Sequence, residues 1–470
     1  MKNYSAFLMT LLFGMCSVTV YAERPQAVNS LKPNIILCMS DDQGWGDVGY
    51  NGHPVLRTPH LDQMSKEGIR FDRFYATSPV CSPTRVACLT GRHPCRQGIP
   101  FANVGKLKEE EITLPEVLKA HGYVTGHFGK WHLGSLTTKI KDGHRGRPGN
   151  FATYSPPWEN GSDESFVAES GVNTYHHEGT YEALGTHYWT GMDQMVPAEE
   201  ISGDDSKLMM NRALEFMEKA VNAETPFLAV IWFHTPHQPV VSAPPYTDGY
   251  EEHKDYYGCL TAMDEQMGRL RTTLKSLEVE NNTMLWFCSD NGPTKVKNSY
   301  GSTGGLNGGK RSLYEGGVRV PGLLIWPKMV AKPRVVSMSC STSDYFPTIL
   351  DMLGLQLPDR PYDGISLMPL IKGEMTERPK PLFFEHCFTQ KYAFVSENPY
   401  NQTAMIDNRY KILSIDGEKT YKLFDLVKDR GERKNIADLH PETVQNMLKE
   451  LNAWRQSVKE SAEGKDYAEK

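Results

Sequence analysis

The sequence predicts an α/β fold in which helices cover both faces of a mostly parallel sheet. Three continuous apolar runs, at 33–42, 226–234 and 283–292, each end in polar residues, as strands buried on both faces do. Amphipathic helical patterns occur around and between these runs, at 58–68, 113–122, 204–221 and 256–277. Such alternation of buried strands and helices is typical of a doubly wound sheet.

The first 22 residues are predicted to be a secretory signal peptide rather than part of the fold. Lys2 precedes the apolar run "AFLMTLLFGMCSVTV", and Ala22 closes it before the polar "ERPQ". Nothing later in the sequence approaches the roughly 18–20 apolar residues that a membrane span needs. We therefore expect an exported protein, periplasmic or secreted, without a membrane span.

Length, charge and cysteine content narrow the class of protein. A chain of 470 residues is long enough for one large α/β domain and a smaller one. The net charge of −6 disfavours nucleic acid and anionic membranes as partners. Eight cysteines remain once Cys16 leaves with the signal, and their spacing shows no disulfide framework, so no pairing is assigned. Nothing in the sequence sets the oligomeric state.

Two composition changes divide the chain. Residues 139–200 are rich in Gly, Pro, His and aromatics, and they are too long for a connector, which favours a substrate-binding insertion. From about residue 380, short strand-like pieces precede a final helix. We predict a catalytic domain at 23–378, interrupted by this insertion, and a C-terminal α+β subdomain at 379–470, formed by an antiparallel sheet and a helix.

Carboxylates and an amide follow two of the predicted strands. Asp41 and Asp42 end the first strand, and Asp290 and Asn291 end the third, where ligands bind in such sheets. Hard oxygen ligands without thiolate or imidazole suit Ca²⁺ or Mg²⁺ rather than zinc. Either pair alone is more often a solvated strand end or a helix cap, but two such pairs favour a metal site.

Several cations accompany these acids. Arg85 lies one helical turn after Cys81, "GKWH" places Lys130 and His132 on one face if extended, and Lys310 lies on a glycine-rich loop. Each of these residues alone is more often structural or solvated. Together with a divalent cation they outweigh the three aspartates, so the pocket favours an anion such as a sulfate or phosphate ester. The N-terminus of the helix at Cys81 adds N–H donors for such a group.

The stretch "CSPTRVACLTGR" at 81–92 resembles the signature of the type I, formylglycine-dependent sulfatases, C-x-P-S/T-R followed by x-x-x-L-T-G. Further hallmarks follow the family's order, namely "SDDQGWGDVGYNG", "GKWHLG", "HTPHQP", "SDNGP", "GGK", "EGGVRVPGLLIWP" and "YKLFDLVKDRGERKNIA". The resemblance covers about residues 33–455 and is closest in character to exported bacterial polysaccharide sulfatases. It implies an alkaline-phosphatase-like, doubly wound mixed sheet flanked by helices.

The same resemblance implies an explanation for the cysteine. In the family this residue is oxidised to Cα-formylglycine by a formylglycine-generating or an anaerobic sulfatase-maturating enzyme, and its hydrate supplies the nucleophilic oxygen. Cys81 matches that position, and Arg85 would hold the modified residue in place. The resemblance also implies Ca²⁺, with Mg²⁺ as the less favoured ion, bound by Asp41, Asp42, Asp290, Asn291 and the modified Cys81.

The remaining catalytic roles also come from the resemblance. Lys130 would polarise the nucleophile and the sulfate oxygens, and His132 would be the base that takes the nucleophile's proton when sulfate is expelled. His237 and Lys310 would flank the bridging oxygen, with His237 as the general acid. We choose His237 over His234 because "HQP" supplies the family's H-x-P context.

Substrate residues are predicted mainly in the insertion. Its aromatic side chains are candidates for stacking on sugar rings, and nearby histidines and an arginine are candidates for contacts with hydroxyls or carboxylates. These candidates are Trp158, Tyr181, His187, Tyr188 and Trp189 for stacking, and His176, His177 and Arg96 for polar contacts. About half would be expected only to pack the insertion. The run at 164–191 is similar to that of sulfatases acting on galactose-type sugars.

Two other classes of function compete with a glycan sulfatase. A phosphatase or phosphodiesterase of the same superfamily would use Ser or Thr as nucleophile and usually two zinc ions, whereas this chain has Cys81 and one set of oxygen ligands. A catalytically dead protein that binds sulfated glycans would have lost Cys81, Lys310 or a metal acid, and all are present. We therefore predict a sulfatase.

Overall fold

The structure is a computed structural model that describes residues 1, 32–177, 185–295, 300–387 and 400–467. Residues 33–470 form one compact unit. All but Met1 of the predicted signal peptide at 1–22 lies outside the described residues, so the signal peptide stays a prediction. No helix within the described ranges is long and apolar enough to cross a membrane.

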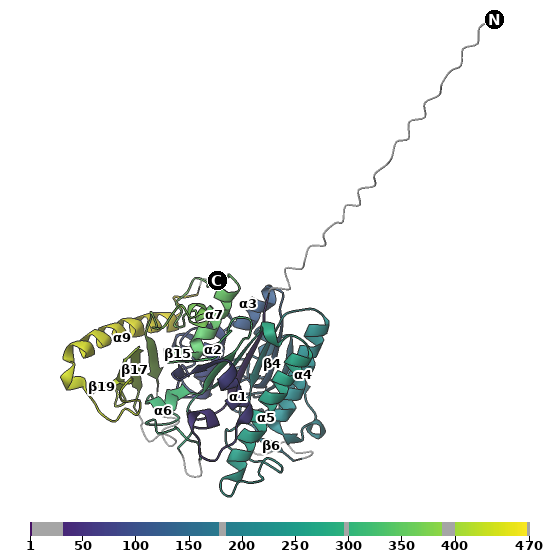
Figure 1. Ribbon diagram of the computed structural model, residues 1–470, viewed down its shortest axis with the longest axis horizontal. Helices are drawn as coiled ribbons and strands as arrows, with labels where there is room; N and C mark the ends of the chain where they lie inside the picture. The colour runs from purple at the N-terminus through teal and green to yellow at the C-terminus, as the bar shows by residue number, and fades with distance from the viewer. Residues whose placement is uncertain (2–31, 178–184, 296–299, 388–399, 468–470) are drawn as a thin grey trace. The chain divides into compact units, whose positions relative to one another are not determined.

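A ten-stranded mixed sheet forms the centre of this unit (Figure 1). Its strands, from one edge to the other, are β14 (Arg334–Val336), β2 (Ile69–Phe71), β13 (Gly322–Ile325), β11 (Thr283–Ser289), β1 (Asn34–Ser40), β10 (Phe227–Trp232), β4 (Val124–Lys130), β5 (Glu164–Ala168), β7 (Tyr188–Gly191) and β8 (Gln194–Met195). The five from β11 to β5 run parallel, whereas β13, β7 and β8 are antiparallel to their inner neighbours.

The three predicted strands lie side by side at the middle of the sheet. In β1, Cys38 is in register with Ile231 of β10 and Phe287 of β11. Every residue of these strands is buried, because helices cover both faces. The continuous apolar runs are explained by this double coverage, and Cys38 and Cys288 are buried thiols, as expected for isolated cysteines in strands.

Helices pack against both faces of the sheet, as the doubly wound prediction requires. Ile36 of β1 belongs to a core shared with α1 (Pro59–Glu67), α4 (Asp205–Asn222) and α5 (Lys254–Ser276). Leu37 belongs to the opposite core, shared with α2 (Cys81–Thr90), α3 (Leu114–Ala120), α7 (Tyr345–Met352) and α8 (Met368–Lys372). Successive side chains of a strand point to opposite faces, so β1 joins two separate cores.

The insertion at 139–200 differs from the irregular segment that its composition predicts. It supplies β5, β7 and β8, which extend the main sheet. Phe166 stacks on Tyr188 with ring centroids 4.4 Å apart, and Val167 pairs with Trp189. Part of the insertion therefore forms one edge of the main sheet, and these side chains are buried there. A separate two-stranded ribbon pairs β6 (Tyr175–His176) with β9 (Gly203–Asp204).

The C-terminal part is the predicted antiparallel sheet with a helix. Its strands are β16 (Leu382–His386), β17 (Gln402–Asp407), β18 (Tyr410–Ser414) and β19 (Lys422–Asp425), and α9 (Pro441–Ala462) lies along them (Figure 1). Phe383 stacks on Trp454 of α9, whereas Phe384 faces Tyr75 of the catalytic part. Both faces are therefore buried. The predicted boundary at 378/379 falls just before β16, although residues 33–470 cluster as a single unit.

Smaller elements connect these layers. A three-stranded sheet joins β12 (Arg319–Val320), β3 (Phe74–Tyr75) and β15 (Cys340–Ser341), and α6 (Glu315–Val318) leads into β12.

Candidate active site

The predicted catalytic residues meet at the carboxyl ends of the central parallel strands. Asp41 and Asp42 follow β1, Asp290 and Asn291 follow β11, Lys130 ends β4, and His237 lies just beyond β10. These four strands are consecutive and parallel in the sheet, so their ends open at the same edge. Segments far apart in the sequence are thereby brought together.

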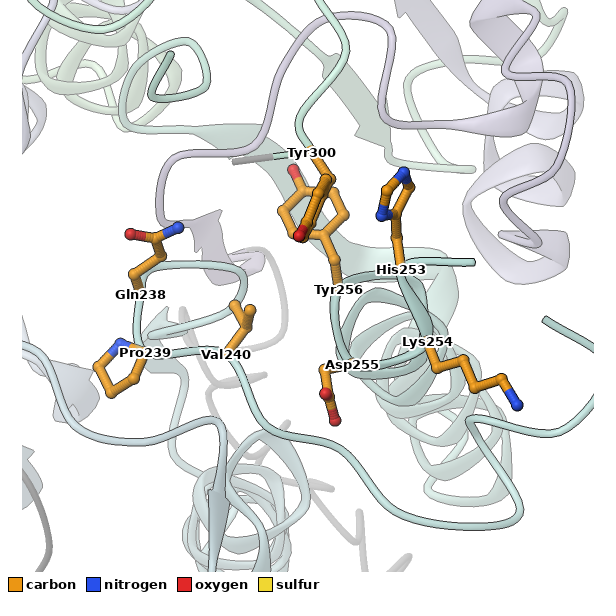
Figure 2. Close-up of a pocket in the computed structure, with 8 residues that line it drawn as sticks. All are labelled: Gln238, Pro239, Val240, His253, Lys254, Asp255, Tyr256 and Tyr300. Carbon is orange, nitrogen blue, oxygen red and sulfur yellow. The ribbon is translucent and has the colours of Figure 1, made fainter. Parts of the chain in front are cut away.

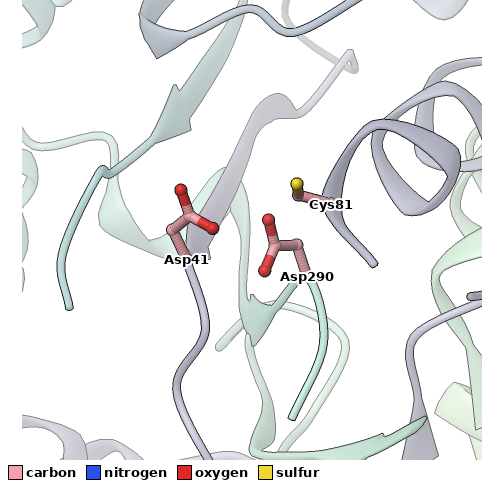
Figure 3. Close-up of side chains that lie close together, drawn as sticks. All are labelled: Asp41, Cys81 and Asp290. Carbon is pink, nitrogen blue, oxygen red and sulfur yellow. The ribbon is translucent and has the colours of Figure 1, made fainter. Parts of the chain in front are cut away.

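Cys81 is the first residue of α2 and lies near two of the predicted metal ligands, Asp41 and Asp290. Figure 3 shows its sulfur pointing toward the carboxylates of Asp41 and Asp290. Ligand atoms of these three residues lie within 4.8 Å of one another. The cysteine is only 2% exposed, and the N-terminus of a ten-residue helix lies directly behind it. The site therefore presents one sulfur-bearing side chain to a cluster of hard oxygen donors.

Each predicted cation pairs with one of the acids. Lys130 Nζ lies 2.6 Å from Asp41 Oδ2, and Arg85 lies 2.6 Å from Asp290 Oδ2. Lys310 Nζ contacts both oxygens of Asp42, at 2.5 and 2.7 Å. These pairs anchor the cations beside the site, and they balance charges that would be costly if buried alone.

The same cations keep two of the buried carboxylates ionised. Burial alone would raise the pKa of Asp41, but the nearby charges of Lys130, His237 and Arg85 outweigh it and hold that pKa well below its usual value. The pKa of Asp42 is lowered in the same way, chiefly by Lys310 against the effect of burial. Burial, with a smaller contribution from the charge of Asp41, raises the pKa of Asp290 to about 7. A bound cation would offset the repulsion among these acids.

The donor set fits a divalent cation. The Oδ1 atoms of Asp41 and Asn291 are buried and have no hydrogen-bond partner among the described residues. Such acceptors are costly unless something binds them. Asn291 donates its amide to Asp42 Oδ1 at 2.7 Å, so its own oxygen stays available. Three carboxylates and an amide oxygen are the donors that Ca²⁺ and Mg²⁺ use in proteins.

The structure separates the two histidines of "HTPHQP". His237 pairs through Nδ1 with the Gln238 carbonyl at 2.7 Å, which leaves Nε2 facing Asp42 Oδ2 at 3.9 Å. His234 is fully buried and is tied by Nδ1 to Asp205 at 3.0 Å. Burial lowers the pKa of His237 to about 4, and Asp41 acts in the opposite direction. The choice of His237 for the site therefore agrees with its position.

A cavity of about 280 Å³ opens beside these groups. Its lining includes Cys81, Lys130, His132, His237 and Lys310, which the sequence predicts for the site. That volume suits a sulfate group and the first atoms attached to it. The cations and the helix N-terminus face a space of the right size for an anionic ester.

Several residues that line or brace this cavity escaped the sequence analysis. Asn103 Oδ1 accepts a 2.6 Å hydrogen bond from His132 Nε2, and both residues have positive φ angles. His144 and Ser170 of the insertion also line the cavity. Arg145 links Glu169, at 2.6 Å, to the Ser82 hydroxyl, at 3.4 Å, beside the nucleophile position. No motif marks these residues, because they come from loops that only the fold brings together.

The predicted substrate residues lie elsewhere, and three of them pack the fold. Trp189 is 3% exposed, belongs to the core and donates to Asp142. Trp158 packs against the same core and donates to the Tyr154 hydroxyl. Arg96 is 2% exposed and forms two hydrogen bonds to Asp363. Their apolar or charged groups are engaged within the protein, so the sugar-binding roles predicted for them do not agree with their positions.

The other candidates do not line the catalytic cavity either. His176 contacts Asp205 at 2.8 Å, His187 contacts Asp142 at 2.9 Å, and the exposed His177 packs edge-on against Tyr175. Tyr188 is buried against Phe166. Tyr181 lies outside the described residues. The insertion thus reaches the site through His144 and Ser170 instead of through its most conspicuous aromatics.

Known proteins share both the sequence pattern and the fold. The sulfatase family model matches residues 33–355, and the model of the N-sulphoglucosamine sulphohydrolase C-terminal region matches 307–457. Human arylsulfatase A is 32% identical over 463 residues, covering 89% of this chain and 87% of that protein. Human N-acetylgalactosamine-6-sulfatase is 34% identical over 369 residues, covering 74% and 67%.

Solved structures of other proteins show the same fold. The crystal structure of Ps i-CgsB in complex with k-i-k-neocarrahexaose superposes with a TM-score of 0.78 at 26% identity, covering 91% of this chain and 93% of that one. PsFucS1 sulfatase from Pseudoalteromonas sp. shares the fold, with a TM-score of 0.73 at 22% identity and 92% of each chain covered. With the cysteine, the acids and the cations already placed at one sheet edge, these matches show that the chain belongs to the sulfatase family and is a sulfuric ester hydrolase.

Proposed function

We propose that this enzyme removes sulfate from a sulfated oligosaccharide or polysaccharide outside the cytoplasm, with Ca²⁺ and a formylglycine made from Cys81. The observation that carries the proposal is the buried position of Cys81 at the start of α2, within 4.8 Å of two acids and beside three cations. A sugar substrate is supported by the likeness to Ps i-CgsB, whose structure holds a neocarrahexaose, and to N-acetylgalactosamine-6-sulfatase. Galactose-type sugars are the first class to assay.

Different residues have different roles in the cleavage of a sulfate ester. Asp41, Asp42, Asp290 and Asn291 would hold the ion, which supplies positive charge to the sulfate oxygens when bound. Formylglycine at position 81 supplies, as its hydrate, a hydroxyl nucleophile that can release sulfate by returning to the aldehyde. Arg85 sits one turn along α2 and fixes Asp290, so it orients both the modified side chain and a metal acid.

Lys130, His132, His237 and Lys310 act on charge and protons at the cavity surface. Lys130 and Lys310 present ammonium groups to the sulfate and its bridging oxygen. His237 donates its Nδ1–H to the Gln238 carbonyl, so it is Nε2 of the doubly protonated ring that gives a proton to that bridging oxygen. His132 lines the same cavity as Cys81 and is held through Nε2 by Asn103, so its Nδ1 is the nitrogen that accepts the proton of the nucleophile.

The proposal is tested by measuring formylglycine formation at Cys81 and turnover of sulfate esters on the same protein samples. The protein is produced with and without a formylglycine-generating enzyme, and the peptide containing Cys81 is weighed by mass spectrometry. Conversion of the thiol to the aldehyde should parallel turnover of 4-nitrophenyl sulfate and of sulfated galactose. Full turnover by protein that retains only the thiol would contradict the proposal.

Export is supported by the apolar run after Lys2 and its small-residue end at Ala22. Fractionation of cells that express the full chain should place the protein in the periplasm or medium, with a new N-terminus near residue 23. Full-length protein retained in the cytoplasm would contradict export, and it would leave the sulfatase assignment intact.

A further inference from the structure

A second cavity, of about 680 Å³, lies beside the catalytic one and takes no part in the roles above. We call it the side groove and define it by Gln238, His253, Lys254, Asp255, Tyr256 and Tyr300, which line it. Figure 2 shows Gln238 and the loop after it on one side, with Tyr300, Tyr256 and His253 on the other. A groove of this size, lined by rings and a few polar groups, is typical of a small-molecule or sugar site.

The side groove is connected to the catalytic cavity through one residue. Gln238 lines both cavities, and its carbonyl holds the His237 ring at 2.7 Å. His237 is the group placed to protonate the bridging oxygen, so the alcohol that leaves with that oxygen lies on the His237 side. The groove begins one residue further along the chain. Its position suits the part of a substrate that is joined to the sulfated sugar.

The aromatic side chains of the side groove are fixed in place. The rings of His253 and Tyr300 stack at a centroid distance of 3.8 Å and an angle of 20°. Tyr256 packs edge-on against Tyr300 and donates its hydroxyl to Asp47 at 2.8 Å. Because these rings are already ordered, a ligand that packs on them loses little additional entropy of the protein.

The backbone conformation of His253 also supports a ligand site at the side groove. This residue has φ of +51°, in the left-handed region that residues other than glycine seldom adopt. The conformation sets the histidine directly before α5, with its ring against Tyr300. Backbone strain of this kind persists where surrounding structure requires it, and it gathers at ligand sites.

The charges of the side groove indicate what kind of group binds there. Lys254 and Asp255 supply one charge of each sign, and Asp255 already accepts the Ser242 amide at 2.9 Å. The lining of the catalytic cavity, by contrast, includes Lys130, Lys310 and Arg311. The side groove therefore suits a hydroxyl-bearing sugar ring better than a second sulfate group.

We propose that the side groove is a sugar subsite that binds the unit joined to the sulfated sugar, with Tyr300 as its stacking platform. This inference rests on the proposed glycan substrate. It places substrate selection in the segments 238–256 and at Tyr300, outside the insertion where the sequence predicted it. Aromatic packing then makes an oligosaccharide a better substrate than the same sulfated monosaccharide.

Steady-state kinetics on matched substrates test the subsite. Sulfated galactose, sulfated carrageenan disaccharides to hexasaccharides, and 4-nitrophenyl sulfate are compared for the wild-type enzyme and for Tyr300→Ala. We expect KM for the oligosaccharides to rise about 2- to 10-fold, the usual contribution of one aromatic contact, with kcat nearly unchanged. Values for the monosaccharide and the aryl sulfate should stay within about twofold.

Two further variants control for folding and for the loss of any tyrosine. Tyr300→Phe keeps the ring and should retain the wild-type preference for oligosaccharides. Tyr410→Ala removes a partly buried tyrosine that packs against His440 in the C-terminal sheet, away from both cavity linings, and should leave the preference unchanged. Thermal unfolding of each variant reports any general loss of structure.

The possible results distinguish a failure of the subsite proposal from a failure of the proposed function. Equal changes on oligosaccharide and monosaccharide, or no change on either, would overturn the subsite while glycan desulfation stands. Wild-type turnover of 4-nitrophenyl sulfate without turnover of any sulfated glycan would overturn the glycan substrate and the subsite with it.

Discussion

Replacing His237 with alanine should slow the desulfation of sugars far more than that of an activated aryl sulfate. His237 Nε2 faces the cavity, and Nδ1 is engaged with the Gln238 carbonyl at 2.7 Å. A sugar alkoxide is a poor leaving group and needs a proton as the S–O bond breaks, whereas a nitrophenolate leaves without one. The loss should therefore depend on the leaving group.

The expected loss of rate in His237→Ala follows from the role of His237 as a general acid. General acid catalysis contributes typically about 10²–10⁴-fold, which corresponds to about 3–5 kcal/mol of transition-state stabilisation. Burial lowers the pKa of His237 to about 4 in the free enzyme. A bound sulfate ester adds negative charge beside the ring and favours its protonated form. Lys310 stays in place in the variant and still stabilises negative charge on the oxygen, so some turnover should remain.

The assay compares kcat/KM of wild type and His237→Ala on sulfated galactose and on 4-nitrophenyl sulfate. His234→Ala is the matched control, because His234 is buried and bound to Asp205 at 3.0 Å. That control should lose about 1–3 kcal/mol of stability because Asp205 Oδ2 loses its hydrogen bond, with similar kinetic losses on both substrates. Equal losses for His237→Ala on the two substrates, or leaving-group dependence in His234→Ala, would refute the assignment of the acid.

Three other outcomes are expected. Cys81→Ala should fold with a wild-type melting temperature and show no turnover of any sulfate ester, and measurable turnover would remove Cys81 from the mechanism. Chelation should abolish activity, and Ca²⁺ should restore it in wild type but not in Asp290→Ala; restoration by zinc alone, measured with metal content by mass spectrometry, would contradict the oxygen-donor site. Trp189→Ala should cost about 3–5 kcal/mol of stability, because the side chain is 3% exposed in the core, and should affect aryl and glycan substrates alike. Thermal unfolding checks the cost, and a loss confined to glycans would return Trp189 to substrate binding.

Much of the fold was predictable because its strongest signals are local. The strands β1, β10 and β11 are buried on both faces, so their sequences are apolar without interruption and stand out from the amphipathic helices. The insertion was harder to interpret. Its strands β5 and β7 are short and lie among glycines and prolines, and they join the sheet only because β5 pairs with β4 and β7 then pairs with β5.

The sequence by itself predicted the candidate catalytic set. Asp41, Cys81, Lys130 and His237 each lie in a short motif at the end of a buried strand or the start of a helix, and parallel strands must bring such ends together. Tertiary structure alone decided how the aromatics are used. A tryptophan that packs a core and a tyrosine that lines a groove are alike in sequence, and their neighbours differ. Trp189 lies on β7 and packs into the core on one face of the sheet, whereas Tyr300 meets His253 from a distant segment beside an open cavity. Burial depends on contacts between segments far apart in the chain, so it is set only when the chain has folded.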